Sequence, residues 1–143
     1  MGLRARTMEL GLGERVRFLG QRSDIAQLLL AADIYCQPNL GAEPFGIALI
    51  EAMHAGLPAV TTAAGGPLEI LNESCGVLVR RNDAASLAAA LETLVKNEGL
   101  RRRLGAAGMR RAAQLCHPGR QLRRLDAIIR RAAGAGIIAR LAG

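Results

Sequence analysis

The sequence predicts an open α/β fold, in which a parallel sheet carries helices on both faces and further helices follow it. Short apolar runs alternate with helical patterns as far as about residue 96, and parallel strands need helical crossovers of this kind. Half of the 143 residues are hydrophobic, but two phenylalanines and one tyrosine are the only aromatic residues. Packing must therefore rely on alanine, leucine, isoleucine and valine, which suits helices laid on a parallel sheet.

Four short apolar runs predict the strands. They cover residues 16–19, 34–37, 59–62 and 76–79. Successive strand–helix–strand units with short connections leave little alternative to parallel pairing. We therefore expect all four runs in one layer, with helices on both of its faces.

Capping and helix-breaking residues delimit the helices of the first half. Ser23 and Asp24 suit the cap of a helix over residues 25–32. Pro44 suits the first position of the next helix, and Gly56 followed by Pro58 supplies its end. Each predicted helix therefore lies between two predicted strands, as a parallel crossover requires.

The second half changes from alternating elements to helices alone. Pro67 opens a short helix, and Asp83 caps a longer one with leucines at helical spacing. Helical patterns then run over about residues 100–116 and 119–133, whereas residues 134–143 have too little periodicity to assign. We expect one domain over residues 1–133, a size that allows a workable core, with residues 134–143 as a tail.

The apolar runs and the cysteines indicate the cellular environment. No run approaches the roughly 20 apolar residues of a membrane span, and the first residues lack the stretch of a signal peptide. Cys36, Cys75 and Cys116 are odd in number and far apart, so neither a disulfide framework nor a metal site is predicted. Reduced thiols favour a cytoplasmic location.

Positive charge is concentrated at the end of the chain. Residues 1–98 carry 8 basic and 11 acidic side chains, a balance of −3, while residues 99–143 carry 11 arginines against Asp126, a balance of +10. This asymmetry favours peripheral contact of the arginine-rich helices with an anionic membrane surface, at the inner face of the membrane. A solvated helical face is one alternative, and docking of this face onto a further domain of the protein is another. Nucleic acid is disfavoured, because this region has no aromatic side chain on which bases stack.

Two predicted strand-to-helix junctions have the composition of an anion-binding loop. Residues 39–47 follow the second run, and residues 63–67 follow the third. Ligands of open α/β sheets bind beyond the carboxyl ends of the strands, where helix N-termini converge. Glycines let the backbone approach a ligand there, and free N–H groups favour a phosphate. Glycine is equally common at turns for steric reasons, so the loops alone leave both interpretations open.

Two glutamates strengthen the ligand interpretation. Glu43 precedes the predicted helix, and Glu51 lies within it among apolar residues. An ionised carboxylate only accepts hydrogen bonds, so vicinal sugar hydroxyls are natural partners. Eight residues of helix span about 12 Å, so the pair has the reach to bracket a sugar, a diphosphate and a ribose. In the alternative interpretation, neither glutamate binds a ligand. The first is then favoured at the helix N-terminus by the helix dipole, and the second is simply exposed on the helix.

The residues around these glutamates resemble the signature of retaining glycosyltransferases of the GT-B fold, in the large group called family 4. Its hallmark is two glutamates separated by seven residues, the second followed by alanine and methionine, and residues 43–53 meet it. Residues 56–60 and 65–69 match as well, and the similarity runs from about residue 8 to residue 131. The resemblance implies a partial Rossmann-like, nucleotide-sugar-binding domain, which is the C-terminal half of a GT-B fold.

The resemblance also implies a role for each matching residue. Glu43 would be the catalytic carboxylate, contacting donor-sugar hydroxyls and stabilising the charge that develops at the anomeric carbon. Glu51 would hold the ribose hydroxyls. The implied donor-binding residues are Phe45, Gly46, Ile47, Glu51, Gly65, Gly66 and Glu69. No metal or other cofactor is implied, because cationic side chains and helix dipoles neutralise the leaving diphosphate.

Members of this family also have parts that this chain does not match. An arginine and a lysine hold the diphosphate upstream of the first predicted strand, and a separate domain binds the acceptor. We therefore expect the chain alone to bind donor weakly at best, without transferring sugar, and to self-associate through an uncovered sheet edge. A noncatalytic binding module of the same fold is the main alternative. A nucleotide-sugar epimerase is a further one, which the glutamate spacing disfavours.

Overall fold

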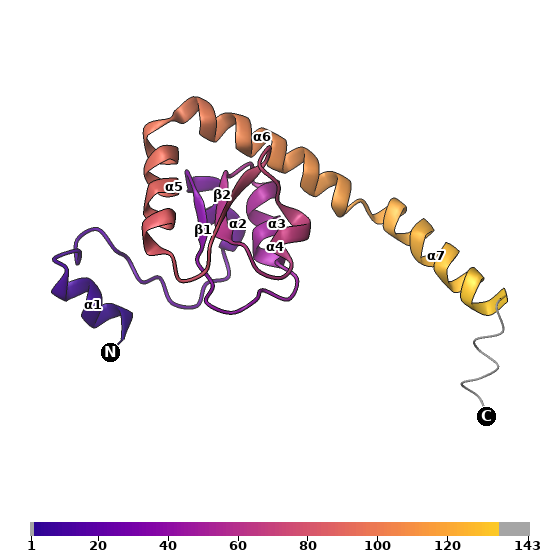
Figure 1. Cartoon of the computed structure of the whole chain (residues 1–143), viewed down its shortest axis with the longest axis horizontal. Helices are drawn as coiled ribbons and strands as arrows, with labels where there is room; N and C mark the ends of the chain where they lie inside the picture. Colours follow the sequence, from indigo (N-terminus) through magenta and orange to yellow (C-terminus); the bar gives the residue numbers. More distant parts are fainter. Residues whose placement is uncertain (1, 135–143) are drawn as a thin grey trace.

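A three-stranded parallel sheet lies at the centre of the molecule (Figure 1). The computed structural model describes residues 2–134. Its strands are β1 (Tyr35–Gln37), β2 (Ala59–Thr62) and β3 (Gly76–Val79), in the order β1-β2-β3. In the register, Val60 lies opposite Cys36 on one side and Val77 on the other. Both pairings are parallel, which confirms the predicted topology for these three strands.

The prediction of a fourth strand over residues 16–19 is wrong. This segment lies between α1 (Leu3–Glu9) and α2 (Ile25–Ala31) and has no strand structure. Phe18 packs against the Arg4 guanidinium, 4.8 Å from the ring centroid, and remains 37% exposed. An apolar run is stable as a strand of a parallel sheet when both of its faces are covered. Here the apolar side chains stay outside the core, so the run gains too little burial to pair.

The remaining helices are α3 (Ile47–His54), α4 (Pro67–Ile70), α5 (Ala84–Lys96), α6 (Glu98–Leu115) and α7 (Pro118–Gly134). Pro67 begins α4 as predicted, and Asp83 caps α5 by accepting a hydrogen bond from Ser86 N–H at 2.9 Å. Asp24 precedes α2 but does not cap it, because its carboxylate binds Arg22 Nε at 2.7 Å instead. Within residues 2–134, no helix combines the length and hydrophobicity needed to cross a bilayer.

The predicted start of the third helix at Pro44 is also wrong. The helix begins at Ile47, after Gly46, whose φ of 93° lies in the left-handed region. The physical reason is that Glu43 forms an isolated parallel bridge with Gly65. This bridge holds the chain extended at Glu43, so the turn into α3 comes later, at the glycine that tolerates a positive φ.

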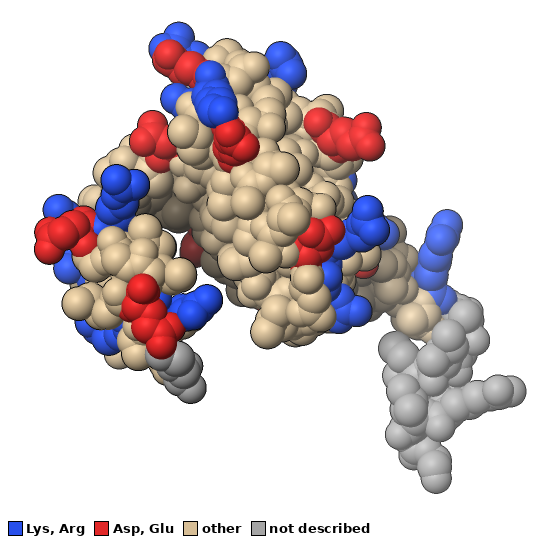
Figure 2. Space-filling view, turned by 60° about the vertical axis from the view of Figure 1, so that its left-hand side comes forward, with Lys and Arg blue, Asp and Glu red and all other residues tan. Residues whose placement is uncertain are grey.

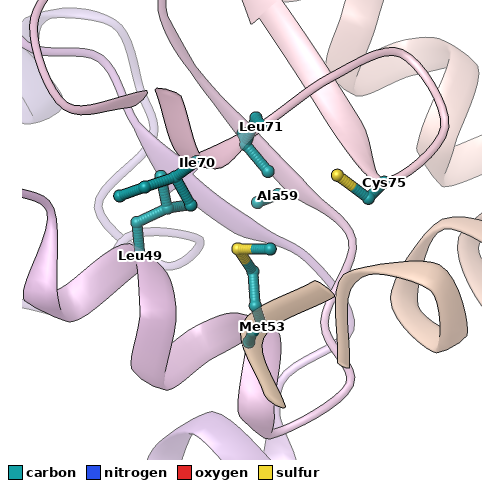
Figure 3. Close-up of a cluster of buried hydrophobic side chains, with 7 residues drawn as sticks. Leu49, Met53, Ala59, Ile70, Leu71 and Cys75 are labelled. Carbon is teal, nitrogen blue, oxygen red and sulfur yellow. The ribbon is translucent and has the colours of Figure 1, made fainter. Parts of the chain in front are cut away.

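Helices cover both faces of the sheet, as predicted. Ala59 and Val60 are neighbours on β2 and therefore point to opposite faces. The cluster on one face, beneath α3 and α6, appears in Figure 3 and comprises Leu49, Met53, Ala59, Ile70, Leu71, Cys75 and Ala112. On the other face, α5 and the first half of α6 cover Val60, Val79, Leu94 and Leu104.

α6 spans the molecule and ties the two clusters together. Gly105 lies so close to the turn before β2 that a Cβ atom there would be 2.0 Å from the Gly56 carbonyl oxygen. Further along α6, Arg111 donates to the carbonyl oxygens of Glu69, at 2.8 Å, and of Ile70. These contacts fix α4, and with it the loop after β2, against the rest of the domain.

Candidate functional site

The two glycine-containing loops at the carboxyl ends of β1 and β2 lie side by side. Glu43 follows β1, and its bridge partner Gly65 follows β2. Gly66 N–H donates to the Glu43 carbonyl oxygen at 2.7 Å. A Cβ atom on Gly66 would lie 2.3 Å from the Phe45 carbonyl oxygen, so glycine is required for this close approach. The structure thus brings Glu43, Phe45, Gly65 and Gly66 into one junction.

The Glu43 carboxylate is half-buried and held by three donors. Gln37 Nε2 and Asn39 Nδ2 each donate to Oε2 at 3.1 Å, and Gly46 N–H donates to Oε1 at 3.1 Å. A carboxylate has about four acceptor sites, so about one remains for another donor. Sequence reasoning missed Gln37 and Asn39. The available signal was two polar residues at alternate positions where an apolar strand ends.

Tyr35 extends this network into the core. Its hydroxyl donates to Gln37 Oε1 at 2.8 Å, so the amide of Gln37 links Tyr35 to Glu43. Burial raises the pKa of Tyr35 to about 12, and the negative charges of Glu43 and Glu51 add to this effect. Tyr35 therefore keeps its proton at neutral pH and remains a donor, which fixes the direction in which Gln37 bonds to Glu43.

The start of α3 presents helix-end backbone donors to the same junction. The first N–H groups of a helix have no acceptor within it, which gives the N-terminus a partial positive charge. Gly46 N–H is bound to Glu43, and the helix proper begins at Ile47. Phe45 and Ile47 are 64% and 63% exposed, so this end of the helix is open to solvent. Backbone donors placed in this way suit an anion such as a phosphate.

Glu51 lies on the outer face of α3, one turn beyond its start. Leu49, Ala52 and Met53 are buried on the inner face, whereas Glu51 and His54 are exposed. The last two line a hollow of about 330 Å3 between α3 and α2. The other residues of this hollow are Ile25, Ala26, Leu29, Leu30 and Ala55. A carboxylate and an imidazole thus border a mainly apolar recess.

The two glutamates are not joined by eight residues of helix, as the sequence led us to expect. Only Ile47 to Glu51 is helical, a rise of about 6 Å, because the bridge to Gly65 keeps Glu43 out of the helix. Glu43 and Glu51 still lie on either side of the α3 N-terminus along the chain. Glu43 therefore precedes the helix and Glu51 lies within it, as expected, whereas their assumed helical spacing is wrong.

Glu69 lies apart from Glu51. It lines a second hollow, of about 550 Å3, together with Phe45 and Gly66 on one side and with Gln121 and Arg124 of α7 on the other. Glu51 lines the first hollow, between α2 and α3. The structure therefore gathers most of the predicted residues at one junction and places Glu51 and Glu69 in separate recesses beside it.

Comparison with known sequences identifies relatives over most of the chain. The family described as Glycosyl transferases group 1 matches residues 2–111. A phosphatidyl-myo-inositol mannosyltransferase of Mycobacterium leprae is 46% identical over 101 residues, covering 68% of this chain and 27% of that protein. A D-inositol 3-phosphate glycosyltransferase of Corynebacterium diphtheriae is 36% identical over 110 residues, covering 75% and 26%. The chain spans about a quarter of the length of these curated relatives.

Solved structures agree on the fold. HepE of Anabaena in complex with UDP superposes with a TM-score of 0.80 at 29% identity, covering 87% of this chain and 36% of that one. A sucrose-phosphate synthase of Thermosynechococcus elongatus gives a TM-score of 0.73 at 33% identity, covering 87% and 33%. This chain belongs to the glycosyl transferases group 1 family, and its fold is part of the Rossmann-like half of a GT-B glycosyltransferase.

Proposed function

We propose that this chain is the donor-binding part of a glycosyltransferase and that its ligand is a nucleoside diphosphate sugar. Membership of the family supports sugar transfer. HepE of Anabaena, which is 29–33% identical to this chain, has crystal structures with UDP and with UDP-glucose. A nucleoside diphosphate sugar has three parts that a site must bind, namely the diphosphate, the ribose and the sugar. We propose a partner for each of them around Glu43, Gly66 and the α3 N-terminus.

The diphosphate is the most demanding part, because its charge must be neutralised as it leaves. In this proposal it lies at the N-terminus of α3, against the backbone at Phe45, Gly46 and Ile47. Helix-end N–H groups are donors that need no reorganisation during the reaction, and the helix dipole favours negative charge at this end. The exposure of Phe45 and Ile47 leaves room for a ligand to approach.

The ribose follows along the outer face of α3. Glu51 lies one turn from the start of the helix, and its carboxylate can accept hydrogen bonds from both vicinal hydroxyls of a ribose. The hollow that Glu51 borders is mainly apolar. An apolar recess beside a carboxylate suits a nucleoside, which combines a flat base with a pair of hydroxyls.

Glu43 is the proposed partner of the sugar. Its carboxylate is held in place by Gln37, Asn39 and Gly46, with about one acceptor site left for a sugar hydroxyl. A fixed negative charge beside the anomeric carbon stabilises the positive charge that grows there as the diphosphate departs. We assign Glu43 this electrostatic role, in an enzyme that transfers the sugar with retention as the family 4 resemblance implies.

One observation carries the proposal furthest: the hydrogen bond from Gly66 N–H to the Glu43 carbonyl oxygen, together with the bridge from Glu43 to Gly65. These contacts bring the ends of two parallel strands and the start of α3 to a single point. Ligand sites of open α/β sheets occur at such points, beyond the carboxyl ends of the strands.

Titration calorimetry with UDP and with UDP-glucose tests the proposal on the chain itself. We expect both ligands to bind the chain alone weakly, and Glu51→Gln to weaken this binding further, about tenfold or more. Charge-assisted hydrogen bonds contribute about 1.5–3 kcal/mol, and each 1.4 kcal/mol is about a factor of ten in Kd.

Glu73→Gln is the matched control. Glu73 is exposed in the turn that precedes β3, at the amino ends of the strands, and loses the same charge. It should leave the affinity unchanged. Absence of UDP binding, or equal weakening by both variants, would refute the donor-site assignment.

A further inference from the structure

A chain of hydrogen bonds leads from the core of the domain to the carboxylate of Glu43. Tyr35 and Gln37 are two residues apart on β1, so their side chains lie on the same face of the sheet. The Tyr35 ring packs against the buried cluster beneath α3 and α6. Its hydroxyl donates to Gln37 Oε1 at 2.8 Å, and Gln37 Nε2 donates to Glu43 Oε2 at 3.1 Å. The amide of Gln37 therefore holds the carboxylate against a ring that is itself fixed in the core.

The neighbouring strand β2 fixes the backbone of the same segment. Thr61 Oγ1 donates to the carbonyl oxygen of Gln37, and Thr62 Oγ1 donates to that of Asn39, both at 2.9 Å. The two threonines are 1% and 6% exposed, so these hydrogen bonds are shielded from water. Asn39 Nδ2 in turn donates to Glu43 Oε2 at 3.1 Å. Both side-chain amides thus reach Glu43 from backbone positions that the sheet holds in place.

The donors are divided unequally between the two oxygens of Glu43. Each oxygen of a carboxylate has about two acceptor sites. Gln37 and Asn39 both bind Oε2 and fill it, whereas Gly46 N–H binds Oε1 and leaves one site there. Oε2 is therefore the oxygen by which the carboxylate is held, and Oε1 is the oxygen that can accept a hydrogen bond from a ligand.

All three donors to Glu43 are neutral groups. Elsewhere in the chain carboxylates pair with cations, as Glu98 does with Arg102, and Figure 2 shows acidic and basic side chains next to one another over the body. In the part of the chain that the structure describes, Glu43 forms no ion pair. Amides fix a carboxylate without neutralising it, whereas a cation would cancel its charge. The proposed electrostatic role of Glu43 depends on that charge.

We propose that Gln37 is the positioning residue of Glu43 and that it directs Oε1 toward the donor sugar. This inference rests on the proposed function and adds the residue on which recognition of the sugar depends. The Tyr35 hydroxyl keeps its proton at neutral pH, so Gln37 Oε1 must accept and Nε2 is left to face Glu43. A side chain without an amide at this position would leave Oε2 with one donor, and the carboxylate could then rotate.

Gln37 should affect the sugar separately from the nucleotide. The diphosphate is assigned to the α3 N-terminus and the ribose to Glu51, and neither of these contacts Gln37 through the hydrogen bonds of the structure. Gln37 is half-buried and acts only through Glu43, the proposed partner of the sugar. A general loosening of the site, by contrast, would weaken the binding of the whole donor.

Affinities measured on the whole chain, with and without a sugar on the nucleotide, test the inference. The probes are UDP against UDP-glucose and GDP against GDP-mannose, because the relatives include a structure with UDP-glucose and a mannosyltransferase. We expect Gln37→Leu and Gln37→Glu to weaken the binding of the preferred nucleotide sugar about tenfold. The affinity for the nucleoside diphosphate without sugar should stay within about twofold.

Three further comparisons separate positioning from packing. Gln37→Glu keeps the size of the side chain and the oxygen that Tyr35 binds, and replaces the donor with an oxygen that repels Glu43. Tyr35→Phe removes only the hydroxyl that orients Gln37, so it should cause a smaller loss in the same direction. Gln114→Leu is the matched control, because it makes the same change as Gln37→Leu at an exposed position of α6. It should leave every affinity unchanged.

A second readout follows Glu43 without any ligand. Gly46 N–H binds the same carboxylate, so its amide chemical shift should change in both Gln37 variants and in Tyr35→Phe. The shift should not change in Gln114→Leu. Circular dichroism should be native in all of these variants, since none of the substituted residues is among the buried members of the two clusters.

Either of two results would overturn the inference. One is equal weakening of the nucleotide sugar and the nucleoside diphosphate by the Gln37 variants, which a general loosening of the site would produce. The other is an unchanged affinity for the nucleotide sugars in both Gln37 variants. Failure of the unaltered chain to bind any of these ligands would instead refute the proposed function, and the inference would fall with it.

Discussion

α5 and α7 are both amphipathic helices, yet one is covered and the other is not. In α5, Leu94 is fully buried in the second cluster, and Leu87 and Leu91 pack around it. The two charged residues of α5, Glu92 and Lys96, balance each other as an ion pair. In α7, leucine and isoleucine recur with similar helical periodicity but stay exposed, and the charge is +4.

The spacing of apolar residues therefore predicts that a helix is amphipathic, but it does not predict which part of the protein covers the apolar side. α5 follows β3 after a short turn, so the connection delivers its apolar side to the sheet. α7 follows the 18 residues of α6, a rise of about 27 Å, which carries it past the edge of the sheet. The position of a helix relative to the sheet therefore separates a core helix from a surface helix here, and its charge does not, because α6 also carries a net charge of +4 and contributes to both buried clusters.

The largest expected effect on stability comes from shortening a leucine in α5, and the same change in α7 should have almost none. Leu94→Ala removes a fully buried side chain and should lower the free energy of unfolding by about 2–5 kcal/mol. Leu125→Ala makes the same chemical change on α7 and should stay within about 0.5 kcal/mol. Urea denaturation followed by circular dichroism measures both. Equal losses in the two variants would mean that α7 packs against the domain in solution.

A second pair of variants compares a tightly packed position with an open one, both within α6. Gly105→Ala places a Cβ atom 2.0 Å from the Gly56 carbonyl oxygen, so we expect a loss of about 1–3 kcal/mol in the free energy of unfolding. At Gly99 the nearest atom to a Cβ would be Asn97 Oδ1 at 3.6 Å. Gly99→Ala should therefore stabilise the chain, by up to about 1 kcal/mol. Thermal denaturation decides, and a stabilising Gly105→Ala would contradict the close packing of α6.

The pKa of Tyr35 reports on how deeply its hydroxyl is buried beside Glu43. The chain has one tyrosine and no tryptophan, so an ultraviolet absorbance titration observes this residue alone. We expect a pKa of about 12 in the folded chain and about 10 in denaturant. Because folding raises this pKa, the contribution of Tyr35 to stability is complete below about pH 10 and is lost as the pH rises toward 12.

Glu43→Gln sharpens the same measurement. The variant removes one of the negative charges that raise the pKa of Tyr35, so the folded-state pKa should fall, though not to the denatured value, because burial is the larger cause. A folded-state pKa near 10, or no response to Glu43→Gln, would contradict the network of Tyr35, Gln37 and Glu43.

Much of this fold was predictable from local signals. Three of the four apolar runs are strands, and Pro67 and Asp83 mark helix starts, because these signals act within a few residues. The run at residues 16–19 was not predictable in this way, since a strand also depends on partners that are distant in the chain. The helix start predicted at Pro44 failed for a similar reason. The bridge between Glu43 and Gly65 outweighs the local preference of proline for a helix start.

The sequence motifs indicated candidate site residues, but not the geometry in which the structure places them. The spacing of Glu43 and Glu51 indicated two carboxylates along one ligand, while the structure shows that only Ile47 to Glu51 is helical. The contacts of Gln37 and Asn39 with Glu43 depend on how the chain leaves β1. Such contacts between side chains follow from tertiary structure and have no periodic signal in a sequence.

In the proposed function, a nucleotide binds at the junction of the two loops and α3, and not on the basic helix α7. Amide chemical shifts of the isotope-labelled chain, recorded during titration with UDP, test it most directly. We predict that the largest shifts occur at Gly46, Ile47 and Gly66, with α7 unchanged. Shifts confined to the amides of α7, or none at all, would contradict the account.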